Sequence, residues 1–326
     1  MGLGCQRSLR VEHSGMLGPI NMTEPIATAA ANRMEGFPAV LSCQRMSSGF
    51  SNSNYRFETS SGVFLLRECT GRDRPGVDYE LNVLDWLRAH NFPSSAAIRF
   101  GDGERWISGP GGSLLVLLEW LDGSEPLCEQ VTVKTIARAL GDLHQLPPPS
   151  GGWWRRENPN GREAAAQLAE IIAPDDPAHF QFFRKEFERL RPRLGEPLPG
   201  GLIHGDVFTD NTLFHDGKLV AILDFEDACE DVFLFDVAMT IHGFCFPEEH
   251  WRPDLAQAFL DVYKDRRALT DSERELLPIY LRWCPLAIMG WHLRQLRRRP
   301  DKGNEKRVAE LIRRIETLRE ASWPII

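Results

Sequence analysis

Residues 201–225 read GLIHGDVFTDNTLFHDGKLVAILDF, and this stretch decides the fold. Asp216-Gly217 is a strong two-residue turn signal between two apolar runs, which predicts a β-hairpin. Counting outward from the turn, Asn211 and Asp224 reach the same open end of the hairpin within a residue or two. Asp206 lies on the loop just before the first strand. The pattern therefore gathers two carboxylates and one amide oxygen at one end of a hairpin.

Oxygen atoms gathered in this way are the ligands that Mg²⁺ prefers. This ion keeps several of its waters and bridges a few protein oxygens to phosphate groups. The alternative is an ordinary exposed hairpin with incidental polar residues. The order of the residues favours the metal site, because His204, Asp206 and Asn211 form H-x-D-x-x-x-x-N and Asp224-Phe225 follows the second strand.

This arrangement resembles the catalytic core of the kinase-like phosphotransferases, specifically the aminoglycoside phosphotransferase and choline kinase group. The resemblance implies an α+β, protein kinase-like fold with a small β-rich N-lobe and a larger helical C-lobe. It implies that Asp206 orients and deprotonates the hydroxyl group of an acceptor. It also implies that Asn211 and Asp224 hold Mg²⁺ against the phosphates of ATP.

Two further residues match positions that support the catalytic loop in this family. The histidine equivalent to His204 packs and hydrogen-bonds to steady the loop, so we expect a structural role and not a general base. Asp236, in Leu234-Phe235-Asp236-Val237-Ala238, matches an aspartate that ties the loop down. We expect its side chain to be a buried hydrogen-bond acceptor.

The pattern of the rest of the chain predicts two lobes. Alternating runs on either side of Ser60-Ser61-Gly62 predict one hairpin, and residues 106–108 with the apolar run 114–118 predict a second. Helical periodicity dominates from Thr132 onward. We expect a flexible arm at residues 1–34 with one short helix within 26–34, a nucleotide-binding N-lobe at 35–121, and a helical C-lobe with the catalytic and acceptor sites at 122–326.

The family also has a strand cation paired with a helix acid at the nucleotide phosphates. Arg67 ends an apolar strand and Glu80 lies one turn into the next predicted helix, so these two residues match. Most relatives carry lysine on this strand, whereas a guanidinium group binds phosphate through two hydrogen bonds. A surface arginine and a solvated glutamate are the alternative.

Other nucleotide contacts are expected from a loop and a hinge. The Ser/Asn-rich segment 47–54 occupies the position of the phosphate-covering loop, where Ser51 and Asn52 would cap phosphate oxygens. Glu119 and Leu121 fall where the hinge presents backbone groups to adenine. Backbone recognition leaves no side-chain pattern, so ATP and GTP are not distinguished.

Closer matching points to bacterial homoserine kinases of the phosphotransferase type. Residues 204–211 with Phe214, residues 224–229, and Phe244-Cys245-Phe246 carry this resemblance. Homoserine has an ammonium group and a carboxylate, so its site needs charges of both signs. Arg282 is the candidate for the carboxylate, and four acidic residues after the hairpin are candidates for the ammonium group: Glu226, Asp227, Glu230 and Asp231.

One departure from that branch keeps other acceptors open. The branch tends to have a second arginine where this chain has Ala287. Choline, ethanolamine or an aminoglycoside-type antibiotic therefore remain alternatives, and the four acidic residues could equally form a solvated loop. A catalytically inactive nucleotide-binding scaffold is a further alternative, although such proteins usually lose one of the residues Asp206, Asn211 and Asp224.

Composition limits the classes of partner. The 326 residues include 46 acidic and 38 basic side chains, and a net charge of −8 disfavours nucleic acid as a partner. The arginines at positions 294 and 297–299 more simply neutralise a helix C-terminus. The longest aliphatic run has five residues, 114–118, whereas a membrane-spanning helix needs roughly 20. We expect a small-molecule hydroxyl acceptor and a monomer or homodimer.

The cysteines and the N-terminus favour a reducing compartment. The seven cysteines are an odd number, widely spaced, and without a C-x-x-C pair, so neither a disulfide framework nor a zinc site is expected. The first residues lack the continuous apolar stretch of a signal peptide. We therefore expect a cytoplasmic protein.

Overall fold

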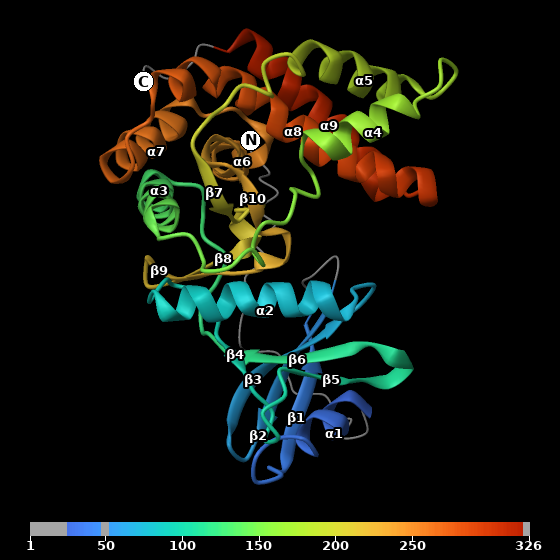
Figure 1. Ribbon diagram of the computed structural model, residues 1–326, viewed down its shortest axis with the longest axis vertical. Helices are drawn as coiled ribbons and strands as arrows, with labels where there is room; N and C mark the ends of the chain where they lie inside the picture. The colour runs from blue at the N-terminus through green and yellow to red at the C-terminus, as the bar shows by residue number, and fades with distance from the viewer. Residues whose placement is uncertain (1–24, 47–51, 322–326) are drawn as a thin grey trace, which may run out of the picture. The chain divides into compact units, whose positions relative to one another are not determined.

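The computed structural model describes residues 25–46 and 52–321 of the chain. These residues form two compact units, shown in one ribbon drawing in Figure 1. Unit 1 comprises the described residues up to Val77 together with Ser95–Ser124. Unit 2 comprises Asp78–Ser94 together with the described residues from Glu125 onward.

Unit 1 is built on an antiparallel sheet with strand order β1-β2-β3-β6-β4, and β5 also pairs with β6. The two hairpins predicted from the sequence are confirmed as β2–β3 and β5–β6. The strands are β1 (Val40–Arg45), β2 (Ser53–Thr59), β3 (Gly62–Cys69), β4 (Ala97–Ile98), β5 (Trp106–Ser108) and β6 (Leu114–Glu119).

Helix α1 (Pro25–Ala31) belongs to the core of unit 1. Its residues Ile26 and Ala30 are buried in the same cluster as Phe57 and Leu117 of the sheet. Burial of these apolar side chains holds the helix in place. Residues 25–34 fall within the predicted flexible arm, but the structure places five of them in this packed core: Ile26, Ala27, Ala30, Ala31 and Met34. The remainder of that arm, residues 1–24, lies outside the described residues.

Unit 2 is mainly helical. Helix α2 (Arg74–Ala89) begins in unit 1 and contributes its residues from Asp78 onward to unit 2. The other helices are α3 (Gln130–Gln145), α4 (Arg162–Glu170), α5 (Ala178–Leu190), α6 (Phe233–Phe244), α7 (Pro253–Arg266), α8 (Asp271–Arg298) and α9 (Lys302–Glu320). Two small antiparallel pairs of strands accompany them: β7 (Gly200–Ile203) with β10 (Cys229–Val232), and β8 (Thr212–His215) with β9 (Lys218–Ile222).

Helix α6 forms the centre of unit 2. Every residue from 234 to 242 is buried, which is typical of a helix that is covered on all sides. An ideal Cβ atom at Gly243 would lie 2.8 Å from the backbone oxygen of Val207, so only glycine permits α6 to approach this loop so closely. Helix α6 therefore packs directly against the loop at residues 204–208.

The architecture confirms the α+β class expected from the sequence. Unit 1 contains the larger sheet, and helices predominate in unit 2. Helix α9 buries the apolar side chains of Val308, Leu311, Ile315 and Leu318 along one face. Across residues 25–46 and 52–321, no helix combines the length and the apolar character that crossing a bilayer requires.

Candidate functional site

The β8–β9 hairpin sets the geometry of the site. Asp216 and Gly217 have φ values of 48° and 73°, as a two-residue hairpin turn with both central residues in the left-handed region requires. Thr212 pairs with Ile222 at the open end of the hairpin. The backbone N–H of Leu223 donates to the oxygen of Asn211 at 2.8 Å. Asn211 and Asp224 thus lie at the same end of the hairpin.

Asp206 and Asn211 are joined by direct hydrogen bonds. The Asn211 Nδ2 group donates to Asp206 Oδ2 at 3.0 Å and to the Asp206 backbone oxygen at 2.9 Å. These bonds fix the orientation of both side chains. Within the described residues, Oδ1 of Asn211 accepts no hydrogen bond, so this amide oxygen is available to a ligand.

Asp224 has an unusual backbone conformation. Its φ and ψ of 60° and 68° lie in the left-handed region, which a non-glycine residue adopts at a cost of about 1 kcal/mol. Strain of this kind is tolerated where the surrounding structure fixes the chain. Here β9 precedes Asp224, and the buried Phe225 follows it. The conformation is thus set by its neighbours on both sides.

The site concentrates negative charge. Burial is the main cause that raises the pKa of Asp206 well above its usual range, and the charges of Asp227, Asp210 and Asp224 raise it further. Carboxylates that repel one another in this way attract cations. The hard oxygen donors of Asn211 and Asp224 are the kind that Mg²⁺ or another hard divalent cation prefers.

His204 has both ring nitrogens engaged by the backbone. The buried ring donates from Nε2 to the Leu223 oxygen at 2.8 Å, and Nδ1 accepts the Asp206 N–H at 3.1 Å. The ring also lies 4.4 Å from the ring of Phe225, centroid to centroid. His204 therefore connects the loop to the end of β9, and the lone pair of its Nδ1 is already engaged by the Asp206 N–H, which argues against a role as a base.

Asp236 of α6 holds the same loop from the other side. Its oxygens accept the N–H of His204 at 2.9 Å and the N–H of Gly205 at 2.8 Å. His144 of α3 contributes a third hydrogen bond at 3.1 Å. Burial alone would raise the pKa of Asp236, but the hydrogen bonds from the His144 side chain and from the backbone of His204 hold it below the usual range. Asp236 is thus an ionised, buried acceptor.

The polar network continues beyond Asp236. Nδ1 of His144 lies 2.7 Å from the hydroxyl group of Tyr263, which also accepts a hydrogen bond from Arg267. Arg267 pairs with Glu273 at 2.9 Å, and Glu273 closes the capping box at the start of α8. A chain of buried polar groups therefore runs from the N-terminus of α8 to the loop that carries Asp206.

The four acidic candidates after the hairpin have different surroundings. Glu226 and Asp227 lie on the short helical turn η3 (Phe225–Asp227), and Glu230 and Asp231 lie on β10. All four are half-buried, so they do not form a freely solvated loop. They face residues 155–160, a segment in which no sequence motif indicates a function.

Residues 155–160 run alongside the acidic segment. Arg156 donates to the backbone oxygen of Glu226 at 2.6 Å, and its own oxygen accepts the N–H of Glu230 at 2.9 Å. Asn160 donates to Asp227 at 3.4 Å. The only local signal here is Asn-Pro-Asn-Gly at 158–161, which indicates a turn and nothing more.

The structure does not bring Arg282 to the catalytic loop. Burial lowers the pKa of its guanidinium group, and its charged neighbours are Glu186, Arg319 and Arg189, on or next to α5 and α9. Its Nε donates to the oxygen of Pro278 within α8. Arg282 thus lies on the face of α8 that has its charged neighbours on α5 and α9, and its assignment to the acceptor carboxylate stays a prediction.

Unit 1 holds most of the residues expected to contact the nucleotide. Arg67 is buried on β3, and its Nε donates to Asn54 Oδ1 at 3.3 Å. Asn52 is also buried, whereas Ser51 lies outside the described residues. Glu80 is buried on the part of α2 that belongs to unit 2.

The expected hinge follows β6. The N–H of Glu119 donates to the oxygen of Ala96 at 2.8 Å, and its oxygen accepts the hydroxyl group of Ser95 at 3.2 Å. The N–H of Glu119 is therefore already used within the sheet. Leu121 lies two residues further on and is half-buried.

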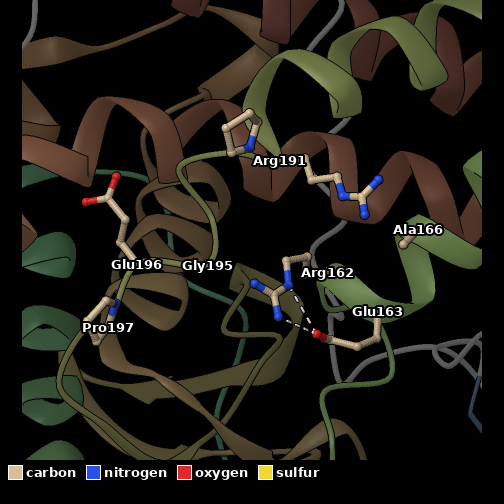
Figure 2. Close-up of a pocket in the computed structure, with 8 residues that line it drawn as sticks. Arg162, Glu163, Ala166, Arg191, Gly195, Glu196 and Pro197 are labelled. Atoms are coloured by element: carbon tan, nitrogen blue, oxygen red, sulfur yellow. Dashed lines mark hydrogen bonds and ion pairs between the residues drawn. The ribbon is translucent and has the colours of Figure 1, made fainter.

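A separate hollow in unit 2 contains none of these residues. Figure 2 shows it lined by side chains from α4 and from the segment after α5, and its volume is about 630 Å³. Within it, Arg162 and Glu163 form an ion pair at 2.8 Å.

Comparison with known proteins places this geometry in a family. Residues 42–274 match the model of the "Phosphotransferase enzyme family". The homoserine kinase of Caulobacter sp. (strain K31) is 32% identical over 255 residues, which cover 72% of this chain and 75% of that protein. The homoserine kinase of Nitrobacter winogradskyi is 29% identical over 259 residues, covering 77% of this chain and 78% of that protein.

Solved structures share the fold at lower identity. The amicoumacin kinase hAmiN, in complex with AMP-PNP, Ca²⁺ and Ami, has a TM-score of 0.68 at 17% identity, covering 85% of this chain and 87% of that one. A choline/ethanolamine kinase family protein from Mesorhizobium loti has a TM-score of 0.67 at 17% identity, covering 90% and 94%.

Proposed function

Because the chain belongs to the phosphotransferase enzyme family, we propose that it is an ATP- and Mg²⁺-dependent kinase for the hydroxyl group of homoserine or a similar amino alcohol. The observation that carries the proposal is the placement of Asp206 on a clamped loop, hydrogen-bonded to Asn211, at the hairpin end that also bears Asp224. Phosphoryl transfer needs positioning and charge neutralisation, and no covalent intermediate on the enzyme is required.

Asp206 is the catalytic residue of the proposal. Its carboxylate accepts a hydrogen bond from the acceptor hydroxyl group, orients the oxygen toward the phosphoryl group, and receives the proton as transfer proceeds. Asn211 holds this carboxylate in one orientation. His204 and Asp236 fix the backbone on which Asp206 stands. The loop therefore presents Asp206 without rearrangement.

Asn211 and Asp224 would hold the metal ion. One amide oxygen and one carboxylate are a small ligand set, and Mg²⁺ commonly binds few protein oxygens while keeping waters and phosphate oxygens. When bound, the ion neutralises the charge of the nucleotide phosphates. The relative of known structure that contains AMP-PNP and Ca²⁺ supports the use of a nucleotide and a divalent ion.

Unit 1 would supply the nucleotide site. Arg67 would bind phosphate oxygens, with Glu80 as its acidic counterpart. Ser51 and Asn52 would contribute to the loop over the phosphates. The backbone oxygen of Glu119 and the backbone groups of Leu121 would contact adenine. The position of Arg67 on β3 supports this role, since a guanidinium group is able to bind phosphate through two hydrogen bonds.

The acceptor is proposed from the curated relatives. Homoserine kinases at about 30% identity match three quarters of the chain. The half-buried acidic residues near Asp206 support an acceptor that carries an ammonium group. Choline, ethanolamine and aminoglycosides share that group, so they are the competing acceptors.

We further propose a cytoplasmic monomer or homodimer. The buried free thiols of Cys229, Cys245 and Cys284 support a reducing compartment.

The test is an ATP-consumption screen with the purified full chain. The acceptors are homoserine, serine, choline, ethanolamine and an aminoglycoside, each with and without Mg²⁺. We expect Mg²⁺-dependent ADP release with homoserine, and formation of the phosphate ester detected by ³¹P NMR. ADP release that no acceptor stimulates would contradict the kinase assignment. Stimulation by choline or an aminoglycoside and not by homoserine would replace the acceptor and leave the kinase reaction in place.

A further inference from the structure

Two of the four acidic residues near the site are engaged by other protein groups. Glu230 accepts a hydrogen bond from Arg155 Nη1 at 2.6 Å. Both oxygens of Asp231 are occupied, one by Asn158 Nδ2 at 2.7 Å and one by the N–H of Val232 at 2.7 Å. The ammonium group of a substrate would have to displace these partners. Glu230 and Asp231 are therefore less suited to bind it.

Asp227 lies directly against the loop that carries Asp206. An ideal Cβ atom at Gly205 would be 3.0 Å from the backbone oxygen of Asp227 and 3.8 Å from its Cβ. Gly205 also has a φ of +84°, so both the space and the conformation require glycine. Since Gly205 immediately precedes Asp206, the backbone of Asp227 adjoins the loop that carries the proposed catalytic carboxylate.

Arg294, on α8, brings a positive charge to the same cluster. Its Nη2 donates to Asn160 Oδ1 at 2.8 Å and to the oxygen of Pro159 at 3.4 Å. Within the described part of the chain, Arg294 makes no direct ion pair with a carboxylate. Its side chain is half-buried, and a guanidinium group withdrawn from water without an anionic partner is unfavourable. The position is therefore suited to an anionic group of a ligand.

Asn160 connects the two charges. Its Oδ1 accepts from Arg294, and its Nδ2 donates to Asp227 Oδ2 at 3.4 Å. A side-chain amide is able to accept at one end and donate at the other, so it spans a guanidinium group and a carboxylate. The result is a row of cation, amide and anion, with the anion next to the catalytic loop.

From this row we propose that Arg294 binds the α-carboxylate and Asp227 the α-ammonium group of a hydroxyl-bearing amino acid, while Asn160 positions both side chains. The inference rests on the proposed function, because Asp206 must receive the acceptor hydroxyl group. An α-amino acid carries both charges on one carbon atom, so its site needs opposite charges close together. Choline and ethanolamine have no carboxylate, and an aminoglycoside presents ammonium groups alone.

The experiment separates the two charges of the acceptor. Three acceptors are used: homoserine, 3-aminopropan-1-ol, which lacks only its carboxylate, and 4-hydroxybutanoate, which lacks only its ammonium group. Each is measured as an acceptor or as a competitive inhibitor of homoserine phosphorylation. The variants are Arg294→Gln, Arg294→Lys and Asp227→Asn. Arg298→Gln is the matched control, because it removes the same charge from an exposed position one turn further along α8.

Arg294→Gln should raise KM or Ki at least about 30-fold for homoserine and 4-hydroxybutanoate, with little change for 3-aminopropan-1-ol. Arg294→Lys should restore part of this loss. Asp227→Asn should show the converse, weakening homoserine and 3-aminopropan-1-ol and sparing 4-hydroxybutanoate. The KM for ATP should stay constant in all of them, and Arg298→Gln should behave as the wild type.

The results distinguish a wrong assignment of Arg294 from a wrong acceptor. If Arg294→Gln weakens all three compounds equally, Arg294 merely supports the fold of the segment at 159–160 and the inference is overturned. The same holds if homoserine is phosphorylated and its KM responds to Arg282→Gln and not to Arg294→Gln. A wild-type protein that phosphorylates no amino acid would overturn the proposed acceptor itself, and this inference with it.

Discussion

The side chain of His144 donates from Nε2 to Oδ2 of Asp236, 3.1 Å away, and both groups are fully buried. The same carboxylate also accepts hydrogen bonds from the backbone N–H groups of His204 and Gly205, on the loop that carries Asp206. A helix that contains none of the predicted site residues, α3, thereby helps to place the proposed catalytic aspartate.

Asp206→Asn should abolish turnover while leaving nucleotide affinity nearly unchanged. The amide keeps the shape of the side chain and is still able to accept the hydrogen bond from Asn211, but it takes up no proton. Loss of a general base typically costs 10²-fold or more in rate. Steady-state kinetics and nucleotide binding by calorimetry check this. A variant that retains more than half of the wild-type rate would show that another group does the chemistry.

Asp224→Ala should abolish Mg²⁺-dependent activity, and Asn211→Ala should raise the Mg²⁺ concentration needed for half-maximal rate. The first change removes a charged ligand and the second a neutral one. Asn211→Ala also frees Asp206 from its hydrogen bond, so kcat should fall as well. Titration of activity with Mg²⁺ separates these effects. Small and equal effects of both changes would contradict the metal site at the end of the hairpin.

Asp236→Asn should reduce both stability and turnover. An amide has one oxygen for the two N–H groups of His204 and Gly205, so one buried donor loses its partner. The free energy of unfolding should fall by about 1–3 kcal/mol. Displacement of the loop should lower kcat by about 10- to 100-fold with little effect on the KM for ATP.

The matched control for this change is Asp261→Asn, on the exposed face of α7, where the carboxylate pairs with Lys264. Urea denaturation and kinetics of both variants make the comparison. If the two variants lose the same amount of stability and neither loses turnover, Asp236 does not position the loop.

Stability should decrease as the pH falls below about 6.5. Burial and the neighbouring charge of Arg314 hold the pKa of His242 well below the unfolded value of about 6.5, and burial also lowers the pKa of His144. Between the folded and unfolded pKa values the unfolded chain binds more protons. Each such histidine then lowers the free energy of unfolding by up to about 1.4 kcal/mol per pH unit of acidification.

His242→Gln should remove one of these contributions. A glutamine oxygen is able to accept the hydrogen bond that Arg314 now donates to His242 Nε2 at 3.2 Å. Denaturation between pH 5 and 7.5 should therefore give a shallower slope for this variant than for the wild type. His215→Gln, on the exposed hairpin turn, serves as the control. Parallel slopes for all three proteins would rule out His242 as a source of the pH dependence.

Local patterns predicted the parts of the fold that depend on neighbouring residues. The turn at Asp216-Gly217 determines the register of β8 with β9, and that register is enough to bring Asn211 and Asp224 to one end. Hairpin β2–β3 follows in the same way from its two-residue turn. In such elements, the pairing distance along the chain is short, so sequence periodicity and turn residues specify it.

Contacts between residues that are far apart in the sequence could not be predicted from local patterns. His144 meets Asp236 across 92 positions, and Asn160 meets Asp227 across 67 positions. No periodicity relates these residues. Helix α8 shows the same limit, because Pro278 and Pro285 lie inside a continuous helix of 28 residues where proline normally indicates a break. Without its true extent, the faces that Arg282 and Arg294 present could not be assigned.

The left-handed backbone at Asp224 sets function against thermostability in this protein. Glycine would relax that conformation, and a screen for heat-resistant variants would be expected to enrich Asp224→Gly while discarding the carboxylate at the end of the hairpin. A protein selected for folding alone would drift away from aspartate here. Asp224 therefore couples a cost in folding free energy to the carboxylate that the proposed metal site requires, so a variant that gains stability at this position should lose Mg²⁺-dependent turnover.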